Sequence, residues 1–222
     1  MKSKIHEIQN TTNKIMSKKI VLALLTVISF ISCEKKETVG DANVHITVNV
    51  DGLSQGKLYL QKIEDTTLVI IDSIQINGDS KFESHIKLDS PEMLYLALDR
   101  GQTNSIDNSL PFFAEPGNIT IETTLKHFFA DAKVKGSKNH DLWIEFKKIN
   151  DRFNDENLVL MEKRLQNELK PNPTTTDSIE AAYEKLLKRK YRYTAHFATT
   201  HGDAAIAPYL ALSEIANINM PY

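Results

Sequence analysis

The clearest pattern in the sequence is an alternation of apolar and polar residues that begins at Val44. Ile46, Val48 and Val50 are separated by single polar residues, as on a β-strand with one buried face. Similar short runs cover residues 57–63, 67–76, 82–88, 93–98, 110–114, 119–123 and 129–134. Gly, Pro and Asn residues between the runs mark turns. We therefore expect an antiparallel β-sandwich or a barrel over residues 44–136.

Two of these turns have recognisable signatures. Asn77-Gly78-Asp79 is typical of a short β-hairpin, which would pair the strands on either side of it. In Glu115-Pro116-Gly117, proline fixes φ at the first central position and glycine allows a positive φ at the second, as a type II turn requires. We interpret this segment as a turn rather than as a binding loop. Four phenylalanines near these turns are expected to pack in the sheet rather than to line a ligand site: Phe112, Phe113, Phe128 and Phe129.

At Ser137 the pattern changes to the helical period. Leu142, Phe146, Ile149 and Phe153 are spaced by four, three and four residues, which places them on one face of a helix. The pattern continues less regularly through Leu158, Leu160, Leu165 and Leu169.

Turn and capping residues divide the helical region into three helices. Pro171-Asn172-Pro173 ends the first helix. Asp177 with Glu180 resembles a capping box at the start of the second helix, and a short last helix is expected near Pro208. The predicted fold class is therefore α+β: an antiparallel β-sandwich-like domain at 44–136, followed by an α-helical hairpin and a short terminal helix within 137–222.

The longest apolar run covers residues 21–33 and ends in the only cysteine of the chain, Cys33. Lys18 and Lys19 precede the run and Ser32 stands directly before the cysteine, so the basic, apolar and small-residue parts of a secretory signal are present. The arrangement resembles a bacterial lipobox, in which the cysteine is lipidated and becomes the mature N-terminus. Phe30 departs from the leucine that is usual at its position.

We therefore expect a signal peptide at 1–32, with Met16 as an alternative start, lipidation of Cys33 and a charged tether at 33–43. The run is shorter than the roughly 20 apolar residues of a transmembrane helix. An uncleaved membrane anchor is the next alternative, and a buried core helix is the third. The expected location is the cell envelope, with a lipid anchor in the outer membrane; the sequence leaves open whether the protein faces the periplasm or the cell surface.

Composition excludes some functions. The 222 residues have a formal net charge of -2, so the chain lacks the basic excess that is typical of nucleic-acid binders. Hydrophobic residues make up 41% and charged residues 25%, as in ordinary globular proteins. A single cysteine cannot form an internal disulfide, and once acylated it would offer no thiol for redox chemistry or metal binding.

The β portion, residues 44 to 145, resembles DUF4369, a domain of unknown function found at the N-terminal end of lipoproteins of Bacteroidota. Its most distinctive part is the segment FFAEPGNITI at 112–121. The other matching residues are Asp72-Ser73, Asn77-Gly78, Phe82, Pro91, Tyr95, Val134-Lys135-Gly136-Ser137 and Asn139.

In many members of that family a helical linker follows, and then a thioredoxin-like domain with a Cys-x-x-Cys motif. The helices of this chain look like that linker, including Ala207-Pro208-Tyr209, and the sequence ends at Tyr222 before any such domain. The resemblance implies a place beside thiol-disulfide or peroxiredoxin-like systems without their catalytic part. It carries over no active-site residues.

Residue patterns predict no catalytic site, cofactor or metal. No serine nucleophile elbow, phosphate loop or zinc cysteine set is present. His196 and His201 are five residues apart, whereas two metal ligands on one helix face are usually four apart. With Asp203 close behind, we interpret them as a solvated helix end. Three other histidines have no recurring carboxylate partner in the sequence: His45, His85 and His127.

Three segments resemble the Asp-Ser/Thr-apolar acceptor of O-glycosylation in Bacteroidota. They place candidate sites at Ser73, Thr66 and Ser178. Ordinary strand and helix-cap chemistry is the alternative explanation for all three.

Two functions are compatible with these observations. The first is a non-enzymatic envelope lipoprotein that presents a binding surface to a partner protein, such as a thioredoxin-like or peroxiredoxin-like protein, or to a glycan. The second is an accessory or truncated member of a thiol-disulfide oxidoreductase family that lacks the catalytic domain. We favour the first. An independent hydrolase is the weakest alternative, because no nucleophile and base can be paired.

Overall fold

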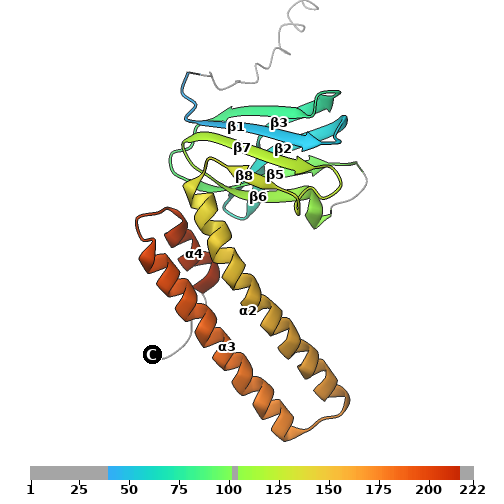
Figure 1. The fold of residues 1–222 in the computed structure, drawn as a ribbon, viewed down its shortest axis with the longest axis vertical. Coiled ribbons are helices and arrows are strands. Elements are labelled where there is room, and N and C mark those ends of the chain that lie inside the picture. Colours follow the sequence, from blue (N-terminus) through green and yellow to red (C-terminus); the bar gives the residue numbers. More distant parts are fainter. Residues whose placement is uncertain (1–39, 102–104, 216–222) are drawn as a thin grey trace, which may run out of the picture. The chain divides into compact units, whose positions relative to one another are not determined.

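The computed structural model describes residues 40–101 and 105–215 (Figure 1). Its strands are β1 (Val44–Asp51), β2 (Gln55–Glu64), β3 (Thr67–Asn77), β4 (Lys81–Ile86), β5 (Glu92–Asp99), β6 (Ser109–Ala114), β7 (Gly117–Thr124) and β8 (Lys133–Lys135), with a short 3-10 helix, η2 (Ile106–Asn108), before β6. Within the described residues they form two four-stranded sheets, in the orders β4-β1-β7-β8 and β3-β2-β5-β6. The α+β class with a sandwich-like β domain is thereby confirmed.

A first hydrophobic core fills the space between the two sheets. The alternation along β1 has the predicted effect, since Val44, Ile46, Val48 and Val50 are all buried in this core. Members from other strands include Leu58, Leu60, Phe82, Leu96, Phe112 and Ile121. One pairing departs from an antiparallel sandwich, because β1 and β7 run parallel.

The turn at Asn77 and Gly78 does not make the predicted hairpin. β3 pairs with β2 and β4 pairs with β1, so β3 and β4 lie in different sheets. Gly78 does have the positive φ of a tight turn, +99°. The hairpin prediction was wrong because the chain crosses between the sheets here, which lets Ile76 and Phe82 both enter the first core.

Two further local predictions need correction. Gly117 has a positive φ, as predicted, but its value of +136° is far from the roughly +80° of a type II turn. The strand expected at 129–134 is only the short β8. Residues 126–131 form a turn instead, in which the Thr123 hydroxyl donates to the Phe128 carbonyl (2.6 Å) and Phe129 remains partly exposed.

The helical region consists of α2 (Lys138–Leu169), α3 (Pro173–Thr200) and α4 (Ile206–Ile215). The predicted N-cap of α3, Asp177, was five residues too late. Asn172 caps this helix, since its side-chain oxygen accepts from the Thr175 N–H (3.3 Å), and Pro173 occupies the first turn, where no N–H is needed. α2 contacts β6 and β8, and α3 runs back beside α2 toward the β domain (Figure 1).

A second hydrophobic core joins the helices to the outer face of the sheet that contains β5 and β6. Consecutive residues of a strand point to opposite faces, so Phe112 enters the first core and Phe113 enters the second. Its other buried members are Met93, Phe146, Phe197, Ile206 and Leu210. The described residues of the β domain and the helices therefore pack into one unit.

Among the described residues, no helix is both long enough and apolar enough to cross a membrane.

Candidate functional site

Glu115 fastens the helices to the β domain. Its carboxylate follows β6 and accepts hydrogen bonds from the backbone N–H groups of Lys138 (2.6 Å) and Asn139 (3.4 Å), and from the Asn139 side-chain amide. These groups belong to the first turn of α2, whose N–H groups lack partners within the helix and whose dipole favours a negative charge. The residue therefore has a structural role, in agreement with the turn interpretation of its segment.

Asn139 extends this connection to α4. While its amide group donates to Glu115, its side-chain oxygen accepts from the backbone N–H of Ile206 (2.9 Å), the first residue of α4. One carboxylate and one amide thus hold the N-termini of two helices that are far apart in the sequence. We call Glu115, Asn139 and Ile206 the junction.

Gly136 allows the chain to turn from β8 into α2. Its φ is +94°, and a Cβ at this position would lie 1.9 Å from the carbonyl oxygen of Asn118. Only glycine fits here without a shift of the backbone.

His140 follows Asn139 in the first turn of α2 and is buried. Its Nδ1 accepts a hydrogen bond from the Phe113 N–H (3.3 Å), and its ring lies against that of Trp143. Burial lowers the pKa of His140, because the charged form would lose its hydration, and the nearby Asp141 carboxylate offsets only part of this effect. As a neutral side chain that accepts the hydrogen bond from Phe113, His140 stabilises the contact between β6 and α2.

The half of the α2–α3 hairpin next to the β domain is built on aromatic packing. Phe146 stacks on Tyr193 and meets Phe197 edge to face, with 5.4 Å between ring centroids in both pairs. This packing ends near Asn150, a buried residue whose side-chain oxygen has no hydrogen-bond partner among the described residues.

The other half of the hairpin, residues 154–190, is packed differently, and we call it the distal hairpin. Leu160 faces α3, where it lines a hollow of about 350 Å³ together with Leu186 and the Glu156–Arg189 ion pair. The remaining large apolar residues of this part of α2 are between 51% and 83% exposed: Leu158, Val159, Met161, Leu165 and Leu169.

Helical geometry separates these exposed side chains from α3. Residues 158, 161, 165 and 169 follow a spacing of three, four and four and so share one face, whereas Leu160 lies about 200° around the helix from Leu158. The apolar stripe of Leu158, Met161, Leu165 and Leu169 therefore points away from the partner helix. We call it the α2 stripe.

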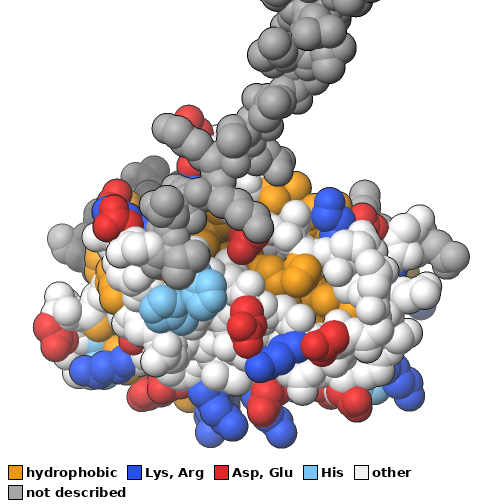
Figure 2. Space-filling model, turned by 90° about the horizontal axis from the view of Figure 1, so that it is seen from above, with side chains coloured by type: hydrophobic (Ala, Val, Ile, Leu, Met, Phe, Trp, Pro, Cys, Tyr) orange, Lys and Arg blue, Asp and Glu red, His pale blue; other side chains and the backbone are white. Residues whose placement is uncertain are grey.

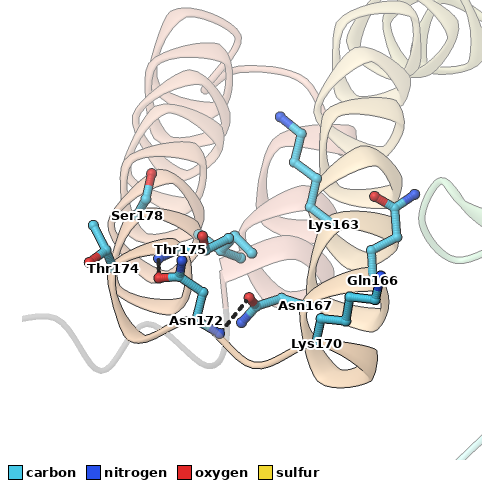
Figure 3. Close-up of a pocket in the computed structure, with 9 residues that line it drawn as sticks. Lys163, Gln166, Asn167, Lys170, Asn172, Thr174, Thr175 and Ser178 are labelled. Carbon is cyan, nitrogen blue, oxygen red and sulfur yellow. Dashed lines mark hydrogen bonds between the residues drawn. The ribbon is translucent and has the colours of Figure 1, made fainter.

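A second hollow, of about 640 Å³, lies where α2 passes into α3 (Figure 3). The Asn167 side-chain oxygen accepts from the Asn172 N–H (3.1 Å), and its amide donates to Thr176 (2.8 Å), so these bonds shape the turn. Figure 3 shows the lining side chains: Lys163, Gln166, Asn167, Lys170, Asn172, Thr174, Thr175 and Ser178, with Ile179. This lining contains two cationic groups and no carboxylate, which favours an anionic or hydroxyl-rich ligand.

The structure distributes the predicted modification sites over separate surfaces. Cys33 lies outside the described residues. Thr66 is exposed in the turn between β2 and β3, Ser73 is exposed on β3, and Ser178 is exposed in α3 beside the second hollow. All three hydroxyl residues are on the surface, and their glycosylation stays a prediction.

One expectation for the histidines was wrong: His127 has a carboxylate partner, because its Nδ1 lies 3.4 Å from an Asp131 carboxylate oxygen. Two further sets of histidines bear on metal binding. His196, His201 and Asp203 form no metal-binding cluster, and no group of three or more potential metal ligands is found in the described part of the chain. His45 and His85, in contrast, are direct partners across β1 and β4, although 40 residues separate them in the sequence. Strand register alone brings them together, so no sequence spacing could have revealed the pair.

The family comparison matches the β domain and the first turns of α2, including Glu115 and Asn139 of the junction. Residues 44–143 match the model of a domain of unknown function, DUF4369. The chain carries a DUF4369 domain. A search among curated proteins finds none that matches the chain.

The DUF4369 match includes the first turns of α2. It ends at residue 143, beyond Gly136, Asn139 and His140, so the residues that cap α2 belong to the domain together with Glu115. The distal hairpin lies outside the match. Sequence patterns found Glu115 and Asn139 as part of a resemblance, but they gave no indication that the two side chains bind each other.

Proposed function

We propose that the protein is a non-enzymatic binding module of the cell envelope, held at a membrane by a lipid on Cys33, and that the distal hairpin binds its partner. The observation that carries this proposal is the α2 stripe, four apolar side chains that are 51–83% exposed on one helix face. Contiguous apolar surface on a soluble domain commonly marks an interaction site. The DUF4369 domain then serves as the support that positions the hairpin.

The proposed partner is a protein with an apolar helix or groove bordered by carboxylates. Its apolar surface would cover the α2 stripe, as in helix-in-groove recognition, where residues spaced by three and four act as anchors. Its carboxylates would meet Lys163 and Lys170, which line the second hollow without an acidic neighbour in that lining. A glycan suits the hydroxyl and amide groups of the hollow but not the α2 stripe.

The test is to purify the native, lipidated protein with its partners, identify them by mass spectrometry, and measure binding of each purified candidate. Leu158→Glu with Leu165→Glu should abolish binding, because two charges would be buried in an apolar contact. Ile144→Glu is the matched control, since Ile144 is also exposed on α2 but lies near the β domain, outside the distal hairpin.

Recovery of the same partner with equal affinity by the double variant would contradict the proposed docking face. A thioredoxin-like or peroxiredoxin-like partner lost by the double variant would make the protein an accessory of thiol chemistry. Binding of a glycan that is insensitive to the double variant and sensitive to Lys163→Ala would replace the protein partner with a carbohydrate.

The lipid anchor has its own test. Cys33→Ala should leave the fold intact and release the protein from the membrane fraction, because each buried CH₂ of an acyl chain contributes roughly 0.8 kcal/mol and stable attachment needs more than one chain. Circular dichroism checks the fold, and fractionation checks attachment. Full retention of the variant in membranes would rule out lipidation at Cys33.

A further inference from the structure

His45 and His85 form a close pair on the outer face of the first sheet. Their Nδ1 atoms are 2.7 Å apart, and the ring centroids are 5.0 Å apart in an edge-on arrangement. At this separation one nitrogen donates a proton and the other offers a lone pair. Histidine side chains gather at the surface, open to solvent, on the face seen in Figure 2.

The backbone holds the Cα positions of the two histidines opposite each other before any ligand arrives. His45 lies on β1, which is hydrogen-bonded on both sides, to β4 and to β7. The β1–β4 pairing continues through six residue pairs, and the residues that flank His45 on β1 point into the first core. Such a pair is preorganised, because the strands already fix the backbone positions from which the two side chains project.

This separation suits a shared metal ion. Imidazole nitrogens bind Zn²⁺ at about 2.0–2.1 Å, so two of them on one ion are about 2.9–3.4 Å apart for angles between square-planar and tetrahedral. Replacing the shared proton with a cation therefore requires only a small opening of the pair, which rotation of the side chains can provide.

The lysines that precede and follow His85 in the sequence each have a carboxylate partner. Lys81 is bound to Glu83 (3.0 Å), and Lys87 lies near Asp41 (3.8 Å). Asn118 of β7 lies next to His45 in register and carries an amide oxygen. Water would complete the coordination of an ion held by two imidazoles.

We propose that His45 and His85 form a binding site for a divalent transition-metal ion, with Cu²⁺ bound most tightly and Zn²⁺ or Ni²⁺ less tightly. Imidazole ligands select these ions, and affinity for such ligands rises along the series to Cu²⁺. Mg²⁺ and Ca²⁺ prefer oxygen ligands and are excluded. A bound ion would link β4, the edge strand of the first sheet, to β1.

The experiment is a calorimetric titration of the purified full chain with CuCl₂, repeated with ZnCl₂ and CaCl₂. We expect one Cu²⁺ site per chain whose affinity falls at least tenfold in His45→Asn and in His85→Asn, because each variant loses the second, intramolecular ligand. The matched control is His196→Asn, which removes an exposed histidine from α3 and should leave the affinity unchanged.

A second measurement needs no substitution. Paramagnetic Cu²⁺ should first broaden the backbone NMR signals of residues near 45 and 85 in the native protein. Absence of binding at millimolar Cu²⁺, equal affinity in His85→Asn, or earlier broadening around His196 and His201 would each overturn the site. None of these outcomes depends on the lipid anchor or on the distal hairpin.

Discussion

The two halves of the α2–α3 hairpin use their apolar residues in opposite ways. Next to the β domain, Phe146 and Phe197 are buried in the second core. In the distal hairpin, Leu158 and Leu165 are exposed, while Asn167 takes part in the contact between the helices. A continuous helix therefore need not pack in one way along its whole length: the near half attaches the hairpin to the β domain, and the far half leaves apolar side chains exposed.

The strongest way to break the attachment is at Gly136. Gly136→Ala should lower the free energy of unfolding by more than about 4 kcal/mol, since the new Cβ would collide with the Asn118 carbonyl in a backbone conformation that alanine disfavours. Gly78→Ala is the control, because Gly78 also has a positive φ but has open space around it. That variant should lose only about 1–2 kcal/mol. If urea denaturation gives the same loss of unfolding free energy for both variants, the structure has relieved the collision between the new Cβ at position 136 and the Asn118 carbonyl.

The second prediction compares the two halves directly. Phe146→Ala should destabilise the fold by about 3–5 kcal/mol, because it leaves a cavity in the second core. Leu165→Ala should change stability by less than about 0.5 kcal/mol, as expected for an exposed position. Thermal unfolding of both variants measures the difference. A large loss in Leu165→Ala would mean that the α2 stripe is covered within the folded chain.

The third prediction weakens the junction without touching the core. Glu115→Ala should lower the free energy of unfolding by about 1–2 kcal/mol, the usual effect of removing a helix cap. Hydrogen exchange should accelerate at the first turns of α2 and α4, because Asn139 loses the group that orients it. If exchange becomes faster only in α2, the proposed link from Glu115 through Asn139 to the start of α4 is contradicted.

The smallest expected effect is a pH dependence from His140. Its pKa is lowered in the folded protein, so the unfolded chain binds more protons below its ordinary pKa of about 6.5. The contribution of His140 to the free energy of unfolding is therefore fully present above about pH 6.5. It is lost as the pH falls toward the lower pKa that His140 has in the folded protein. Denaturation between pH 7 and 5 should show a shallower decline in His140→Gln. An identical pH slope in the variant would assign the dependence to other groups.

Much of the fold could be predicted because burial follows local periodicity. The alternation in β1 and the spacing around Phe146 placed both elements correctly, and both depend only on which face is apolar. The start of α3 was missed because Asn172 and Pro173, which ended one helix in the sequence pattern, also begin the next. The crossing at Gly78 was missed because a turn sequence does not reveal whether the next strand joins the same sheet.

The candidate surfaces were harder to predict for a physical reason. Leu158, Leu165 and Leu169 look like core residues in the sequence, and only the position of α3 shows that they face outward. His45 and His85 are related through strand register, which is set by the whole sheet. Sites built from long-range pairing leave no local signal, whereas caps and strands do.

The junction also has a mechanical consequence. α2 has 32 residues and so is about 48 Å long, and among the described residues its polar bonds at the β-domain end are those around Glu115 and Ser137 and the bond from the Phe113 N–H to His140. A rotation of about 5° at that end would move the far tip by about 4 Å over such a length. The hairpin thus acts as a lever. A force applied at its tip would be transmitted to the few hydrogen bonds that join the start of α2 to the edge of the DUF4369 domain.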